Sequence, residues 1–265
     1  MSITDFSSLA DRRDLQSASQ APGSRSNLLL AGLSPKALSE LQNRLRVEDL
    51  TVGTVLWEVG AHVGQIVFPT SGTISIRVPT KEGNAIQVAL VGPESAVGFP
   101  QELGGYTAIT RGEVQISGRF TTIPASAFAA AAERNDEVGR LAAVCNNWLL
   151  IQSQQLAACN ASHSADARFC HWLLRATDSL ALSVIPVTQE VIAESLGIRR
   201  TTATLIAQQL QMQGLISYSR GRIMIRDRAG LQAAACDCAI ALGPSDRPTE
   251  LLRPNANTGT WPAVS

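Results

Sequence analysis

The sequence predicts an α+β protein with an N-terminal antiparallel β-barrel or jelly roll, a long dimerisation helix and a C-terminal winged helix-turn-helix. Three stretches of the chain support this prediction. Residues 50–128 contain short apolar alternations separated by glycines, and residues 136–160 carry a continuous helical pattern. Residues 189–226 read as two short helices around one glycine, followed by a basic hairpin.

Length and composition favour more than one domain in a water-soluble chain. The 265 residues exceed a typical single domain, and 45% hydrophobic residues suffice for packed cores. The amino end lacks the apolar core of a signal peptide, and no stretch approaches the ~18 apolar residues of a membrane span. We therefore expect a cytoplasmic protein. The five cysteines, an odd number, predict reduced thiols.

Shifts in composition divide the chain into five segments. We expect a flexible leader over residues 1–27, a β-rich domain over residues 28–133 and a long helix over residues 134–162. A winged helical domain over residues 163–240 and a flexible tail over residues 241–265 complete the chain. The leader and the tail are rich in Ser, Pro, Asn and Gly, which predicts their mobility.

The β-rich domain shows the pattern of a hairpin. Apolar residues alternate over residues 73–78 and again over residues 86–90, and residues 81–84 supply a turn between them. Glycines recur at short intervals, and no long helix intervenes. This pattern favours brief antiparallel strands over a parallel α/β layer.

The long helix carries an apolar stripe with mixed three- and four-residue spacing. Its members are Val138, Leu141, Cys145, Trp148, Leu149, Leu156 and Cys159. We expect the stripe to pack against the same helix of a second subunit, because the helix has more apolar surface than one domain covers. Packing wholly on its own domain stays open as the alternative, since Gln152 and Gln155 interrupt the stripe.

Residues 188–213 predict two helices joined by a tight turn. Thr188 is a good N-cap, and Gly197 can adopt the left-handed conformation that ends the first helix. The second helix begins at Arg200 and buries one apolar face. That face consists of Ala203, Ile206, Ala207 and Leu210. This arrangement is a helix-turn-helix.

The charges of this region predict double-stranded DNA as the partner. The whole chain is neutral, with 22 basic and 22 acidic residues, so a polyanion must be met by a local patch. Residues 187–228 contain six arginines against three acidic residues. Arginines and threonines crowd the N-terminal turn of the second helix, the end that favours phosphate and enters a major groove. For the paired arginines alone, the alternative is a solvated helix start. For the function, the alternative is a small-molecule-binding or adaptor protein whose winged domain contacts protein rather than DNA.

A family resemblance rests on the stretch VTQEVIAESLGIRRTTATLIAQQLQMQGLISYSRGRIMIRDRAGLQAAACDC. It resembles the winged-helix domain of the Crp–Fnr family of bacterial transcription regulators. The glycine-punctuated region resembles the cyclic-nucleotide-binding-like barrel of that family, which would make residues 28–133 a sensor domain. The resemblance covers roughly residues 28–240 and implies a homodimer on a near-palindromic operator. It also makes RNA polymerase a candidate partner and leaves room for an unknown small effector in the barrel.

The predicted DNA-binding residues combine the basic patch with this resemblance. They are Thr188, Gln189, Arg199, Arg200, Thr201, Thr202, Thr204, Leu205, Arg220 and Arg222. By resemblance, Arg200 and Thr201 fall where the family reads base edges, and Thr188 and Gln189 fall on backbone-contacting positions. Leu205 falls where some members carry another base-reading residue. Because an apolar residue stands there, no half-site sequence is assigned.

The sensor region departs from the family members that respond to cyclic nucleotides. Those members carry a Gly-Glu pair and an Arg-Ser pair that grips the cyclic phosphate. Here Gly92 and Glu94 only loosely match the first pair, and Arg111 precedes Gly112 instead of a serine. These three residues are the effector-pocket candidates, although Arg111 also fits a surface strand. We do not expect cyclic AMP as a ligand.

Neither a metal nor a catalytic site is predicted. The N-terminal cysteines that hold an iron–sulfur cluster in other members are absent before Cys145, so no such cluster is expected. Cys236 and Cys238 lie too close for the usual zinc knuckle, and Cys159 with His163 fits an ordinary helix end. No Ser–His–Asp, P-loop or paired-acid constellation stands out, so we expect no enzyme and no cofactor.

Overall fold

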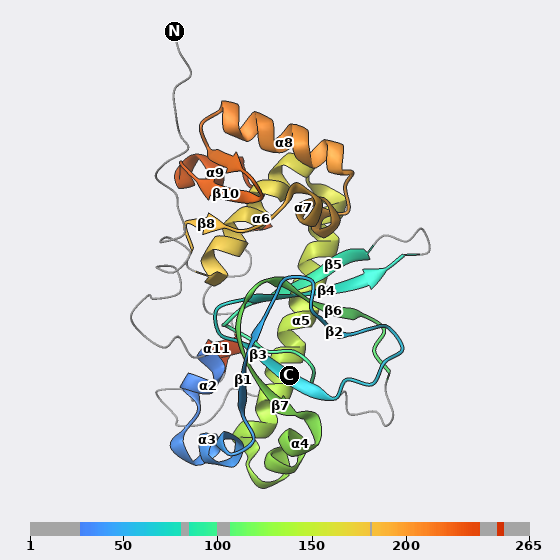
Figure 1. Cartoon of the computed structure of the whole chain (residues 1–265), viewed down its shortest axis with the longest axis vertical. Helices are drawn as coiled ribbons and strands as arrows, with labels where there is room; N and C mark the ends of the chain where they lie inside the picture. The colour runs from blue at the N-terminus through green and yellow to red at the C-terminus, as the bar shows by residue number, and fades with distance from the viewer. Residues whose placement is uncertain (1–26, 81–84, 100–106, 181, 239–247, 252–265) are drawn as a thin grey trace.

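The computed structural model describes residues 27–80, 85–99, 107–180, 182–238 and 248–251. The predicted flexible leader, apart from its last residue, lies outside this range, as does the predicted tail apart from residues 248–251. The predicted hairpin turn over residues 81–84 also lies outside it. Within the described range the chain forms a β-sandwich, a long central helix and a helical domain at one end (Figure 1).

The N-terminal half contains two antiparallel sheets packed face to face. One sheet has the order β1-β7-β3 and the other the order β2-β6-β4-β5. The strands are β1 (Arg46–Leu50), β2 (Val55–Trp57), β3 (Gln65–Pro69), β4 (Thr73–Pro79), β5 (Ala85–Val91), β6 (Arg111–Ile116) and β7 (Gly118–Pro124). The described strands do not close into one continuous barrel, which leaves the jelly-roll form of the prediction. The predicted hairpin is confirmed, since β4 pairs with β5 from Ile74↔Val91 to Pro79↔Ala85.

Apolar residues from both sheets fill the space between them. Val67 and Phe120 from one sheet pack with Ile74, Val91 and Val114 from the other. All five are fully buried. At about 25 cal/mol per Å² of apolar surface, residues of this kind supply most of the stabilisation of such a sandwich.

Helices cover one end of the sandwich and run along it. They are α2 (Leu28–Gly32), α3 (Pro35–Gln42), α4 (Ala125–Arg134) and α5 (Asp136–Ser162). Asn135 caps α5, because its Oδ1 accepts hydrogen bonds from the amides of Glu137 and Val138. The predicted long helix is therefore confirmed. In Figure 1 it passes through the centre of the molecule and connects the sandwich to the C-terminal domain. A short helix, α11 (Pro248–Leu251), lies beside α2.

Most of the apolar stripe expected at a dimer seam instead packs inside the chain, whereas Leu149 and Leu156 are partly buried. Val138, Leu141 and Cys145 are fully buried and contact α4 and the sandwich, and Trp148 is buried as well. These side chains cannot also form a subunit interface. Another row of α5 residues is exposed, and its spacing alternates regularly between four and three. This row consists of Ala143, Asn147, Leu150, Gln154, Ala157 and Ala161.

The C-terminal domain is helical with a small sheet. Its elements are α6 (Ala165–Leu180), β8 (Val184–Ile185), α7 (Gln189–Leu196), α8 (Arg200–Met212), β9 (Ile216–Ser219), β10 (Arg222–Ile225) and α9 (Arg228–Ala234). The sheet order is β8-β10-β9, and the predicted basic hairpin is confirmed by the pair Arg222↔Ser219. Phe169, Leu173, Ile192 and Ile223 belong to its apolar core, which also includes Ile116 at the end of β6. Among the helices of the described residues, none combines the length and the apolar character needed to cross a membrane.

Candidate nucleic-acid interface

The turn between α7 and α8 has the geometry that its sequence requires. The Thr188 hydroxyl accepts a hydrogen bond from the Val191 amide at 3.3 Å and begins α7. Gly197 ends α7 with φ +62°, a left-handed conformation that costs glycine little. The Ile198 amide then donates to the Ala193 carbonyl at 3.0 Å, which closes the turn. These local contacts set the angle at which α8 leaves α7.

One face of α8 packs on the domain core and the other faces outward. The predicted buried face is confirmed for Ala203, Ile206, Ala207 and Leu210. Arg199, Arg200 and Thr201 are exposed at the start of the helix, and Leu205 is 66% exposed one turn later. An exposed leucine of this kind is suited to an apolar contact such as a thymine methyl group. The N-terminal turns of α8 are therefore open to solvent.

The remaining predicted residues of the two helices have a different position. Gln189, Thr202 and Thr204 are only partly exposed. The Thr204 hydroxyl donates to Gln189 Oε1 at 2.8 Å and lies 3.0 Å from the Arg200 carbonyl. This contact joins α8 to α7, so Thr204 and Gln189 hold the two helices together in the free protein.

The hairpin of β9 and β10 forms the wing. Arg220 and Gly221 connect the strands with φ +48° and φ +74°, as in a type I′ turn. Arg220 and Arg222 are exposed. The Tyr218 amide donates to Gln211 Oε1 at 2.9 Å, which fixes the wing against the outer side of α8. The wing arginines thus stand on the same rigid domain as the start of α8.

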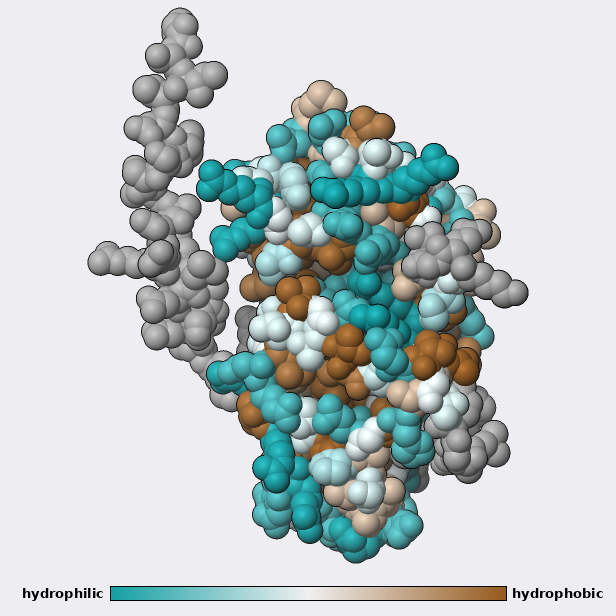
Figure 2. Space-filling model, turned by 45° about the vertical axis from the view of Figure 1, so that its right-hand side comes forward, coloured by the Kyte–Doolittle hydropathy of each residue, from teal (hydrophilic) through white to brown (hydrophobic). Residues whose placement is uncertain are grey.

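Charged and polar groups dominate this end of the molecule. Figure 2 shows hydrophilic side chains across much of the upper part of the visible face, where the C-terminal domain lies in Figure 1. Arg200 has only a loose exposed contact, with its Nη1 3.8 Å from Glu190 Oε2. A pair at that distance and exposure contributes little, so Arg200 remains available to a phosphate or a base edge.

Specific contacts join the sandwich to α7. Arg77 Nη1 lies 2.9 Å from Glu194 Oε2, and Gln115 Nε2 donates to Ser195 Oγ at 2.9 Å. A cleft of about 820 Å³ opens beside these contacts. Its lining includes Arg77, Arg111, Glu113, Glu190, Glu194, Arg199 and Arg200. The start of α8 therefore shares a charged cleft with the sheet β2-β6-β4-β5.

The structure places two of the three effector-pocket candidates at one turn and the third beside the cleft. Glu94 is buried, and its Oε1 accepts a hydrogen bond from the Gly92 amide at 3.1 Å, which closes a local turn. Arg111 of β6 pairs with Glu113 of the same strand at 2.9 Å and with Glu58, which follows β2, at 3.2 Å, and it lines the cleft. Neither Gly92 nor Glu94 is among the residues that line the cleft.

Sequence reasoning missed two groups of residues. The contact between Arg77 and Glu194 joins residues 117 positions apart, and no local pattern indicates it. The sequence offers two residue pairs, Cys159 with His163 and Cys236 with Cys238, and neither pair alone indicates a metal site. The fold brings all four side chains into one cluster. The signal available in the sequence was the presence of two incomplete metal-ligand pairs in one chain.

Comparisons with known proteins agree with this geometry. Residues 167–234 match the family model of the Crp-like helix-turn-helix domain. A Crp/Fnr-family transcriptional regulator from Eubacterium rectale has 19% identity and a TM-score of 0.60, covering 78% of this chain and 96% of that chain.

Two further solved structures are similar in the same way. FixK2 from Bradyrhizobium japonicum has 16% identity and a TM-score of 0.63, covering 72% of this chain and 98% of its own. A Crp/Fnr-family regulator from Thermus thermophilus has 21% identity and a TM-score of 0.60, with coverages of 72% and 98%. At these identities the likeness shows a shared fold. No curated protein matches the chain in sequence.

Proposed function

We infer that this chain, which carries a Crp-like helix-turn-helix domain within a Crp/Fnr-type fold, is a DNA-binding transcription regulator. The observation that carries the inference is the exposed start of α8. Arg199, Arg200 and Thr201 surround the helix N-terminus, and the opposite face of the helix is fully engaged in the core. An outward helix end with free donors and a favourable dipole fits a major groove.

The contacts divide into two kinds by their position. Arg200 and Thr201 project from the first turn of α8, where side chains reach base edges. Arg220 and Arg222 project from the wing, where phosphate oxygens of the adjacent backbone are the nearer targets. Base contacts would carry sequence preference, and wing contacts would add affinity for any DNA. Thr188, at the N-terminus of α7, has a second helix end available for a phosphate.

We place the homodimer seam on the exposed row of α5. Its four-three spacing, from Ala143 to Ala161, is that of a two-helix seam, and Leu150 is 55% exposed near its centre. Small alanines at the other apolar positions allow two helices to approach closely. A twofold axis along this seam gives the two recognition helices a symmetric arrangement that matches a near-palindromic operator.

The contacts between the sandwich and α7 give the regulator a route from sensor to DNA. A ligand or partner that alters β4 or β6 would act on α7 through the Arg77 and Gln115 contacts. A regulator of this kind would act in the cytoplasm, where the bacterial chromosome lies. RNA polymerase is its proposed partner at promoters. Nothing in this role requires catalysis by the chain.

Genome-wide mapping of bound DNA followed by footprinting of one site tests the proposal. A mapped operator should bind the purified chain with a Kd of about 10⁻⁸ M or tighter at physiological salt. The affinity should fall steeply as salt rises, because bound arginines release counterions from DNA. Failure to recover any enriched DNA, together with salt-insensitive binding of a protein partner, would instead support an adaptor.

A further inference from the structure

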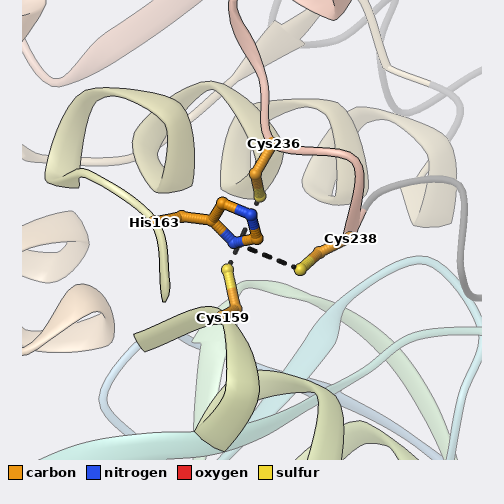
Figure 3. Close-up of side chains that lie close together, drawn as sticks. All are labelled: Cys159, His163, Cys236 and Cys238. Carbon is orange, nitrogen blue, oxygen red and sulfur yellow. Dashed lines mark hydrogen bonds between the residues drawn. The ribbon is translucent and has the colours of Figure 1, made fainter. Parts of the chain in front are cut away.

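Four potential metal ligands meet where the long helix ends. Cys159 and His163 stand at the C-terminal end of α5, and Cys236 and Cys238 follow α9. Figure 3 shows the three sulfur atoms and the imidazole ring pointing toward one another. One ligand atom from each residue lies within 4.8 Å of all the others. The two pairs are separated by more than seventy residues in sequence, so the fold alone brings them together.

The measured separations agree with the edges of one tetrahedron. Bonds of about 2.3 Å to sulfur and about 2.0 Å to nitrogen place the ligands of tetrahedral zinc roughly 3.5–3.8 Å apart. The Sγ atoms of Cys159 and Cys236 lie 3.5 Å apart, and so do Cys238 Sγ and His163 Nδ1. An iron–sulfur cluster would distribute its ligands around several iron atoms. The short separations therefore fit a single ion.

Groups around the cluster support this arrangement. His163 Nε2 lies 3.2 Å from Asp237 Oδ1, so the ring nitrogen other than the one beside Cys238 Sγ meets a carboxylate. Protein metal sites commonly use this carboxylate contact to orient a histidine ligand and select its tautomer. His171 Nδ1 lies 3.3 Å from Cys236 Sγ, where an N–H can donate to a thiolate.

The cluster buries too few apolar side chains to serve as a hydrophobic core. Cys159, Cys236 and Cys238 are buried and form a group of their own, with Ala167 as the partly buried apolar residue packed against them in the described part of the chain. Three small sulfur side chains and one alanine provide little hydrophobic stabilisation. The same four side chains provide a complete Cys₃His ligand set, which is typical of closed structural zinc sites.

We propose that Cys159, His163, Cys236 and Cys238 bind one structural zinc ion. The ion links the end of α5 to the segment after α9. The chain itself joins α5 to the C-terminal domain through the short connection between α5 and α6. The ion thereby fixes the DNA-binding domain to the helix that extends from the sandwich. Thiolates and imidazole are ligands that zinc prefers over the harder magnesium and calcium ions.

Metal analysis of the purified full chain tests the proposal. We expect about one zinc ion per chain, because a closed Cys₃His site retains its metal through purification. Removal of zinc by a chelator followed by addition of Co²⁺ should give the visible bands of tetrahedral cobalt and the ultraviolet bands of cobalt–thiolate bonds. Cys159→Ser and Cys238→Ser should each lower the zinc content at least about tenfold.

Two controls separate ligation from folding. Cys145→Ala alters another buried cysteine of the same helix. Burial raises the pKa of the Cys145 thiol to about 12, so this thiol is a poor metal ligand, and the Cys145→Ala variant should keep its zinc. Asp237→Asn should keep the metal but lower its affinity about tenfold, because it changes only the orienting carboxylate. Wild-type protein that contains no zinc and gives no cobalt bands would overturn the proposal, as would a Cys159–Cys236 disulfide in the freshly purified chain.

Discussion

Arg77 on β4 and Glu194 on α7 form an ion pair between the sandwich and the helix-turn-helix, with Nη1 and Oε2 2.9 Å apart. The Arg77 side chain is 8% exposed and that of Glu194 is 47% exposed. Arg77 Nε also donates to Ser75 Oγ at 3.1 Å, which holds the guanidinium in one orientation. A buried guanidinium needs a charged partner, so this pair holds α7 against the sheet that contains β4.

A double-mutant cycle should show that this pair contributes to stability. Arg77→Ala, Glu194→Ala and the double variant should give a coupling of about 1–2 kcal/mol in urea unfolding, reduced from a fully buried pair because Glu194 is half exposed. Arg119 and Asp49 form the control pair, at 3.4 Å with both side chains mostly exposed, and should couple by less than about 0.5 kcal/mol. Equal coupling in the two cycles would contradict the assigned role.

Arg200 and Arg220 should affect DNA binding in different ways. Arg200→Ala should cost about 1–3 kcal/mol at the operator and relax preference at one symmetric base position, because the proposed role of Arg200 is contact with a base edge. Arg220→Ala should weaken all sequences about equally and reduce the salt slope by about one per contact. Fluorescence anisotropy with operator and scrambled DNA at several salt concentrations measures both. An equal loss on both DNAs for Arg200→Ala would show that another face reads the sequence.

The exposed row of α5 allows a test of the proposed homodimer. Leu150→Asp should weaken the dimer about tenfold or more, because it introduces an unpaired charge at the centre of the seam. Val47→Asp is the matched control, since Val47 is 65% exposed on β1, outside α5. Sedimentation equilibrium measures both dissociation constants. A wild-type monomer at micromolar concentration, or equal effects of the two variants, would remove the seam from α5.

Two glycine substitutions should change stability in opposite directions. Gly197→Ala should cost about 1 kcal/mol, because φ is +62° and only glycine adopts this conformation without strain. Gly139→Ala lies inside α5, and the added methyl group would meet the Ala132 carbonyl at an ordinary 3.6 Å. It should stabilise the protein by about 0.5–1 kcal/mol through helix propensity. Thermal unfolding followed by circular dichroism gives the sign of each change.

Cyclic AMP should not bind the sandwich. Arg111 is engaged by Glu113 and Glu58, and Glu94 closes a separate turn, so the candidates Gly92, Glu94 and Arg111 provide no prepared phosphate site. Isothermal calorimetry with cyclic AMP should show no saturable heat at physiological concentrations. The same titration with Glu58→Ala and Glu113→Ala tests whether freeing Arg111 creates affinity. Stoichiometric binding by the wild type would show that the ligand uses other residues.

Local sequence determined the DNA-binding module. Thr188, Gly197 and the Arg220-Gly221 turn each act within a few residues of their position, through a cap, a left-handed residue and a two-residue turn. Such contacts need no knowledge of the rest of the fold. The helix-turn-helix, its buried face and its wing could therefore be predicted from spacing alone, as could the β4 and β5 hairpin.

Tertiary structure decided which surfaces of these elements are used. α5 has small or apolar residues on more than one side, so periodicity alone did not distinguish the face that packs on α4 from the exposed row containing Leu150. Arg77 and Glu194 pair although they lie 117 residues apart in sequence. Cys159 and Cys236 meet although they lie 77 residues apart. Contacts at such separations depend on how whole elements pack, because the intervening chain imposes no fixed distance between their ends.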